Sequence, residues 1–306
     1  FAGVGKTAEE IRYALEKEIH CFNVESRSEL EFINEVAGGI GATAPIAVRV
    51  NPNVDAKTHK YISTGKAENK FGIDHGDARE VYEHAAALPH IHIKGVQMHI
   101  GSQLTSVTPF AEAIERVAPL VVQLKSTYGI EFFSIGGGIG IVYDSALDSG
   151  QRDWWDRHED PPLSPVDYAQ KLVPLLQPLG LTILLEPGRY MSGNAGVLLT
   201  TCLYEKKGHA KTFKVVDAGM NDLIRPALYE GHHEIVPVRE NNTDTRVTAD
   251  VVGPICESGD FFCQDREISD FKASDIIALM SAGAYSFTMA SNYNSRPMPA
   301  EILVEG

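Results

Sequence analysis

The sequence predicts two domains, a (β/α)8-type TIM-like barrel over residues 1–192 and an all-β domain over residues 193–306. In the first part, short β-branched runs alternate with helical patterns, which is typical of a parallel sheet with crossover helices. Each run ends in glycine or polar residues, as expected for a barrel whose chemistry lies at the carboxyl ends of its strands. In the second part, strand-like runs follow one another without helices, which indicates a separate β domain.

Five strands and five helices are expected in the barrel domain. The strand-like runs cover residues 20–24, 46–50, 93–99, 132–135 and 182–186. The helical patterns cover residues 7–19, 28–37, 77–88, 110–124 and 166–176. The first helix should begin with a capping box, because Thr7 is followed three residues later by Glu10.

The strand count falls short of a closed barrel. The five runs and the end of one strand before Gly3 make six, whereas a barrel of this kind has eight. The chain also begins at Phe1 without an initiator methionine. We therefore expect two βα units to precede this sequence in a longer protein.

The β domain should be built from six strands, preceded by a long loop. The expected strands cover residues 197–204, 212–216, 234–238, 248–252, 275–280 and 300–304. The loop over residues 144–165 contains Trp154 and Trp155, and loops of this length in compact domains are usually functional or disordered. We expect it to lie near a ligand.

Composition excludes several classes of partner. A net charge of −14 does not suit nucleic acid or an anionic membrane, and no apolar run is long enough to span a bilayer. The four cysteines are spread out without a CxxC pair, which indicates reduced thiols in the cytoplasm and no zinc cluster. No metal is expected.

Three clusters that could carry chemistry fall at expected strand ends: His99–Gln103, Gly136–Gly138 and Glu186–Arg189. A serine hydroxyl and glycine amides can hold a phosphate, an imidazole can stack on a flat ring, and a carboxylate can keep a pyridine nitrogen protonated. Together they indicate an aromatic phosphorylated cofactor. Each piece also has an ordinary explanation: a tight strand-to-loop turn for the glycines, a core histidine, and a structural Glu186–Arg189 ion pair.

The motifs resemble those of the diaminopimelate decarboxylases, pyridoxal-phosphate enzymes of the alanine-racemase-like fold. The matching stretches are HIGSQ (99–103), IGGGIG (135–140), EPGR (186–189), DAGMNDLIRPALYE (217–230), GPICESGD (253–260) and GAYSFTMASNYNSRP (283–297). The resemblance covers essentially the whole chain. It implies a barrel with a β domain, a homodimer with shared active sites, and conversion of meso-2,6-diaminopimelate to L-lysine and carbon dioxide.

The resemblance also implies roles for individual residues. It places His99 against the ring of pyridoxal 5'-phosphate, and Glu186 on the pyridine nitrogen. The residues implied to surround the cofactor phosphate and ring are Ser102, Gly136, Gly137, Gly138, Gly188, Arg189 and Tyr285. The residues implied to contact the substrate are Arg189, Arg225, Tyr229, Tyr285 and, from the partner subunit, Glu257. Cys256 matches the proton donor, so it and His99 are the catalytic candidates.

The charges of these residues agree with such a substrate. Two arginines and a glutamate would recognise a remote end that carries both a carboxylate and an ammonium group. A precursor such as ornithine would leave buried guanidinium groups without an anion. A cysteine is more often an inert core thiol than a catalytic one, and the position of Cys256 between Gly253 and Glu257 is what favours a role in chemistry.

The sequence leaves two alternatives open. The first is a related decarboxylase that acts on arginine, ornithine or a carboxylated polyamine. The second is a non-catalytic pseudoenzyme, because the family's Schiff-base lysine belongs to one of the two units expected upstream. No lysine of this chain, Lys6 and Lys70 included, stands in a matching motif.

Overall fold

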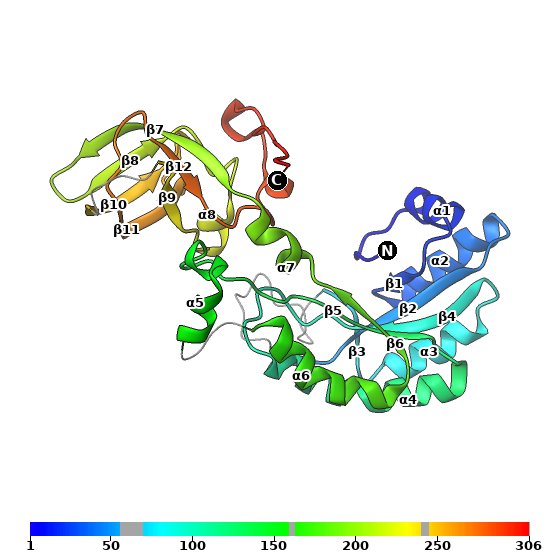
Figure 1. Cartoon of the computed structure of the whole chain (residues 1–306). Helices are drawn as coiled ribbons and strands as arrows, with labels where there is room; N and C mark the ends of the chain where they lie inside the picture. The colour runs from blue at the N-terminus through cyan, green and yellow to red at the C-terminus, as the bar shows by residue number, and fades with distance from the viewer. Residues whose placement is uncertain (56–69, 159–162, 240–244, 306) are drawn as a thin grey trace. The chain divides into compact units, whose positions relative to one another are not determined.

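The computed structural model describes residues 1–55, 70–158, 163–239 and 245–305. The chain divides into two compact units, shown in Figure 1. Unit 1 comprises Phe1–Gly140 and Pro162–Pro187, and unit 2 comprises Ile141–Pro161 and Gly188–Gly306. No described helix is both long and apolar enough to cross a membrane.

Unit 1 is built on a parallel sheet. Its strands are β1 (Phe22–Val24), β2 (Ala44–Asn51), β3 (Ile73–Asp74), β4 (Ile91–Gln97), β5 (Phe132–Gly137) and β6 (Thr182–Glu186). They lie in the order β1-β2-β4-β5-β6, with β3 beside β2, and every pair is parallel. The five expected strands are confirmed. The sixth strand is β3 and was not expected.

The strand expected before Gly3 is not assigned in the described chain, although Phe1 bonds to β1. The Phe1 amino group donates to Cys21 O (2.7 Å), and Asn23 N donates to Phe1 O (2.9 Å). Phe1 thus bonds to the two residues on either side of Phe22, which is the hydrogen-bond pattern of parallel pairing.

The helices of unit 1 follow the predicted pattern. They are α1 (Ala8–Glu16), α2 (Arg27–Gly39), α3 (Ala78–Ala87), α4 (Thr108–Tyr128) and α6 (Pro165–Leu176). The capping box is present, because Thr7 Oγ1 accepts from Glu10 N and Glu10 Oε2 accepts from Thr7 N. Helix α4 buries Phe110, Ile114, Val117 and Val121 at helical spacing. Figure 1 shows α3, α4 and α6 along one face of the sheet.

Unit 2 contains a six-stranded, mainly antiparallel sheet. Its strands are β7 (Leu198–Lys207), β8 (Thr212–Val216), β9 (Ile235–Pro237), β10 (Arg246–Val252), β11 (Phe261–Ser269) and β12 (Ile276–Leu279). The order is β11-β10-β8-β7-β12-β9, and only β8 and β10 pair in parallel. Val216, Val251, Phe262 and Ile277 belong to its apolar core. The expected all-β architecture is confirmed.

One strand predicted for this unit was wrong, and one strand was missed. Residues 300–304 form no strand, and Ile302, Leu303 and Val304 are exposed. β11 was missed, although it is nine residues long. Its polar stretch from Gln264 to Glu267 breaks the apolar alternation that marks a strand.

Short helices complete the chain. They are α5 (Arg152–Arg157), α7 (Gly188–Ser192) and α8 (Arg225–Tyr229), all in unit 2, with the 3-10 turns η1 (Asp148–Gly150), η2 (Gln177–Leu179), η3 (Gly193–Ala195), η4 (Phe287–Met289) and η5 (Tyr293–Ser295). The expected loop over residues 144–165 therefore contains η1 and α5, and residues 159–162 of it lie outside the described part.

The three glycines at the end of β5 lack side chains because neighbouring strand ends approach too closely. A Cβ at Gly136 would lie 2.4 Å from Met98 O, and one at Gly137 would lie 1.9 Å from Glu186 O. A Cβ at Gly138 would lie 2.1 Å from Gly101 O. Gly136 and Gly138 also have positive φ angles (73° and 96°), which favour glycine. Close backbone packing thus explains all three glycines, and contact with a phosphate stays a prediction.

We expect Gly137→Ala to destabilise the fold by about 2 kcal/mol or more, because the added methyl group can only be accommodated by moving the backbone at the end of β6. Urea unfolding measures this change. Gly39→Ala is the matched control, since a Cβ at this position in α2 meets nothing within 4 Å and its stability should be unchanged or slightly raised. Equal stability of Gly137→Ala and the unmodified protein would contradict this account.

Candidate active site

His99 lies just beyond the end of β4, against the glycine turn of β5. Its Nδ1 accepts a hydrogen bond from Gly137 N (3.2 Å), so the ring proton of the neutral form lies on Nε2. Burial, followed by the charge of Arg49, lowers the pKa of His99 to about 4. The imidazole is therefore uncharged at neutral pH, which suits a ring that stacks on an aromatic cofactor.

Glu186 ends β6, the strand that pairs with β5. Its carboxylate is oriented by hydrogen bonds from side chains of β4 and β5. Oε1 accepts hydrogen bonds from Ser134 Oγ of β5 (2.7 Å) and from Gln97 Nε2 of β4 (3.2 Å). No described residue donates a hydrogen bond to Oε2. One oxygen is thus held in place while the other remains available to a donor such as a protonated pyridine nitrogen.

Ser102 lies in the loop that follows β4, next to the glycines. Gly101, directly before it, packs its carbonyl against Gly138, and Leu104 N donates to Gly138 O (2.9 Å). The predicted phosphate-binding serine and glycines of unit 1 are therefore brought together. Gly188 begins α7 and belongs to unit 2.

A buried pair of charges that the sequence analysis missed lies behind His99. Arg49 Nη1 donates to Glu25 Oε1 (2.9 Å), and Glu25 Oε2 accepts from Gly72 N (2.8 Å). Arg49 Nη2 also lies 3.5 Å from His99 O. The pair therefore ties the ends of β1 and β2 to the backbone of His99. Charged residues at the ends of buried strands were the signal that could have revealed it.

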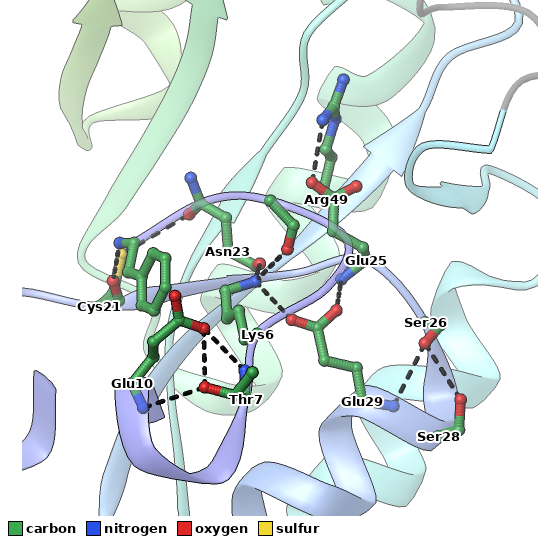
Figure 2. Close-up of polar contacts among 12 residues, drawn as sticks. Lys6, Thr7, Glu10, Cys21, Asn23, Glu25, Ser26, Ser28, Glu29 and Arg49 are labelled. Carbon is green, nitrogen blue, oxygen red and sulfur yellow. Dashed lines mark hydrogen bonds and ion pairs between the residues drawn. The ribbon is translucent and has the colours of Figure 1, made fainter. Parts of the chain in front are cut away.

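Lys6 continues this network on the side of α2, as Figure 2 shows. Its Nζ donates to Gly3 O and Asn23 O (both 2.8 Å) and to the carboxylate of Glu29. Glu29 in turn accepts from the backbone N of Glu25 (2.7 Å). Three oxygens thus surround the Lys6 ammonium group, which gives it a structural role.

In unit 2 the two arginines expected to bind substrate share a neighbour, Tyr143. Arg189 Nη1 donates to Tyr143 OH, and the Arg225 guanidinium lies 4.2 Å from the centre of the Tyr143 ring. Arg189 also lies 4.7 Å from the ring centre of Tyr285. Tyr229, at the end of α8, is half-buried on the same short helix as Arg225. Tyr143 was not expected here, because nothing local in the sequence marks it.

The loop that carries Cys256 and Glu257 is organised by the buried carboxylate of Asp260. Asp260 accepts from Met220 N and Ile255 N (both 2.6 Å), which joins the motifs at 217–230 and 253–260. Cys256 and Glu257 are exposed. Glu257 accepts a hydrogen bond from Tyr293 OH (2.5 Å), and this bond raises the pKa of Tyr293. No hydrogen bond, ion pair or ring contact in the described chain joins Cys256 or Glu257 to Arg225.

The residues of unit 1 fit pyridoxal phosphate. A neutral imidazole after β4 and a carboxylate with one available oxygen at the end of β6 flank the end of β5. They are joined through Gly137, which bonds to His99 and pairs with Glu186. These are the groups that the ring and its nitrogen require. In the described chain no cluster of three or more histidine, cysteine or acidic residues could hold a metal ion.

Comparisons with known proteins agree with this assignment. The family described as "Pyridoxal-dependent decarboxylase, pyridoxal binding domain" matches residues 1–193. The fold and the strand-end residues therefore define a pyridoxal-dependent decarboxylase.

Similar proteins narrow the class further. Proteins named diaminopimelate decarboxylase from Aquifex aeolicus and Pseudomonas aeruginosa are 47% and 48% identical over the whole of this chain and 70% of their own length. The crystal structure of diaminopimelate decarboxylase from Helicobacter pylori complexed with L-lysine has a TM-score of 0.87 at 42% identity, and the match covers 97% of this chain and 71% of that one. The chain belongs to the diaminopimelate decarboxylase family.

We expect His99 to titrate with a pKa of about 4, well below the usual 6.5. The unfolded chain then binds a proton on this ring before the folded protein does, so the contribution of His99 to the free energy of unfolding should fall as the pH drops from about 6.5 toward 4. NMR of 13C-labelled histidine, with His99→Gln to assign the signal, measures the titration. Urea unfolding of both proteins at pH 7 and pH 5 measures stability, and a His99 signal that titrates near pH 6.5 would contradict the burial argument.

Proposed function

We propose that this protein decarboxylates meso-2,6-diaminopimelate to L-lysine and carbon dioxide with pyridoxal phosphate as cofactor. The observation that carries the proposal is the buried guanidinium group of Arg225. No described carboxylate lies within 4 Å of it, and burial lowers its pKa. The names of the relatives and the L-lysine in the Helicobacter pylori complex support the same substrate class.

Arg225 distinguishes diaminopimelate from the alternative substrates. A buried charge without a counter-ion is costly, and a carboxylate at the remote end of the substrate would provide that counter-ion. At this end ornithine carries only an ammonium group, and the substrate arginine carries a guanidinium group. Neither end is an anion, so both substrates would leave Arg225 without a counter-ion. A decarboxylase that acts on ornithine or arginine therefore fits this site less well.

The residues of the chain would hold the cofactor in a defined way. Glu186 would bond to the pyridine nitrogen and His99 would stack on the ring, while Ser102, Gly136–Gly138 and Gly188 would surround the phosphate, with Arg189 and Tyr285 beside the cofactor. When bound, pyridoxal phosphate supplies an acceptor for the electron pair that departing carbon dioxide leaves behind. Glu186 strengthens that acceptor by keeping the nitrogen protonated.

The remaining candidates act on the substrate. Arg189, Arg225 and Tyr229 bind its remote carboxylate, and Glu257 binds the remote ammonium group. Tyr293 donates a hydrogen bond to Glu257 and thereby fixes the direction of the Glu257 carboxylate. The exposed thiol of Cys256 delivers a proton to the substrate carbon after carbon dioxide leaves. Because Cys256 and Glu257 serve the site of the partner subunit in this proposal, the active unit is a homodimer.

We also infer that the protein works in the cytoplasm. All four cysteines are free thiols, and three of them are buried. An oxidising compartment would favour their pairing.

The substrate assignment predicts the effect of Arg225→Gln. The variant should lose about 30- to 1000-fold in kcat/KM for meso-diaminopimelate, because the substrate carboxylate would lose its buried partner. Carbon dioxide release by the holoenzyme measures this, with ornithine and arginine as comparison substrates. Arg246→Gln is the matched control, since Arg246 pairs with Glu267 on the surface of the same unit. Faster turnover of ornithine or arginine, or no turnover of any substrate, would reject the assignment.

The shared-site proposal predicts complementation between two inactive variants. Homodimers of Cys256→Ala and of Arg189→Ala should both be poor catalysts, since general acid catalysis contributes about 10²- to 10⁴-fold in rate. A mixed dimer would have one site with both defects and one with neither, so it should recover up to about half of the normal activity. Purified mixed dimers, assayed beside each homodimer, test this. An absence of recovery would place Cys256 in its own chain's site or outside catalysis.

A further inference from the structure

Arg225 is held from two directions by side chains that have no assigned role in the reaction. One is His233, whose Nε2 lies 2.7 Å from Arg225 Nη1. The other is Tyr143, whose ring centre lies 4.2 Å from the guanidinium carbon. His233 and Tyr143 also touch each other edge to face, with ring centres 5.2 Å apart. The three side chains form one buried cluster.

His233 acts as a hydrogen-bond acceptor in this cluster. A guanidinium group can only donate, so His233 Nε2 must be unprotonated and the ring proton must lie on Nδ1. Nδ1 then donates to Met280 O (2.8 Å). Burial lowers the pKa of His233 to about 3, so the ring stays neutral and keeps its acceptor. Both ring nitrogens of His233 therefore make hydrogen bonds, and an apolar residue at this position could make neither.

Tyr143 contacts each arginine with a different part of its side chain. Its hydroxyl oxygen accepts from Arg189, and its ring face lies against Arg225. Two guanidinium groups at close range repel each other, and the electron-rich ring face and the phenol oxygen both favour positive charge. Tyr143 thus keeps the two cations together in fixed directions.

The backbone of Gly231 packs closely against Arg225, which is possible because glycine has no side chain. A Cβ at Gly231 would lie 3.3 Å from Arg225 Cζ and 3.2 Å from Arg225 O. The side of Arg225 near α8 is therefore filled, and its Nε has no hydrogen-bond partner in the described chain. The guanidinium is oriented by uncharged groups, none of which neutralises it.

We propose that Tyr143 and His233 are positioning residues that hold Arg225 with its charge uncompensated, and that they set the enzyme's preference for ligands with a carboxylate at the remote end. The inference rests on the proposed function, because it takes Arg225 as the residue that binds that carboxylate. A neutral acceptor orients the cation without replacing the substrate as its counter-ion. An acidic residue at position 233 would instead compete with the substrate.

The test compares two ligands that differ only in the carboxylate. L-lysine carries it and cadaverine does not, and isothermal titration of the holoenzyme with each measures the preference. His233→Leu should raise the Kd for L-lysine at least tenfold, because a hydrogen bond to a charged group is lost, and should change the Kd for cadaverine less than twofold. His233→Gln keeps an acceptor near the position of Nε2 and should restore L-lysine binding to within about threefold.

A second variant covers the case in which His233→Leu does not fold. Tyr143→Leu removes the ring face and should also weaken L-lysine selectively, while thermal unfolding confirms that each variant is folded. Equal losses for both ligands, or no loss for either, would overturn the positioning role. An unmodified protein that does not prefer L-lysine to cadaverine would overturn the proposed substrate itself, so the two failures can be distinguished.

Discussion

The close approach of three neighbouring strand ends is the constraint on which the barrel site depends. Glycines at the end of β5 let the backbones of β4 and β6 come within distances that any side chain would prevent. This contact places Gly137 between His99 and Glu186, bonded to the first and in register with the second. The catalytic candidates of unit 1 are therefore positioned by backbone packing before any ligand binds.

Buried positive charges in the described chain differ in whether a carboxylate lies beside them. Lys6, Arg49 and Lys214 are buried beside carboxylates, namely Glu29, Glu25 and the pair Glu205 and Asp270. Each of these cations is neutralised within the fold. Arg225 is equally buried, yet a neutral histidine and an aromatic ring occupy the places where a carboxylate would otherwise lie. This contrast separates cations that pair with carboxylates inside the fold from one that has no such partner in the described chain.

Hydrophobic periodicity was sufficient for most of the fold and failed where its physical basis was absent. Strands β2 and β5 are buried on both faces and show as apolar runs, so they were predicted within a few residues. β11 exposes charged side chains over its middle and was missed. The mostly apolar run at 300–304 has the composition of a strand but pairs with no strand of the described chain, since a strand requires pairing that local sequence does not encode.

The sequence by itself determined the chemical inventory: the glycine turn, His99, Glu186, the two arginines, and Cys256 beside Glu257 in a motif of a known family. Only the tertiary structure decided which neighbours these residues have. Arg49 and Glu25 behind His99, and Tyr143 and His233 around Arg225, come from segments distant in the chain. Tertiary structure also decided protonation, because the low pKa values of His99 and His233 arise mainly from burial. Burial is a property of packed neighbours, and a local sequence pattern cannot specify it.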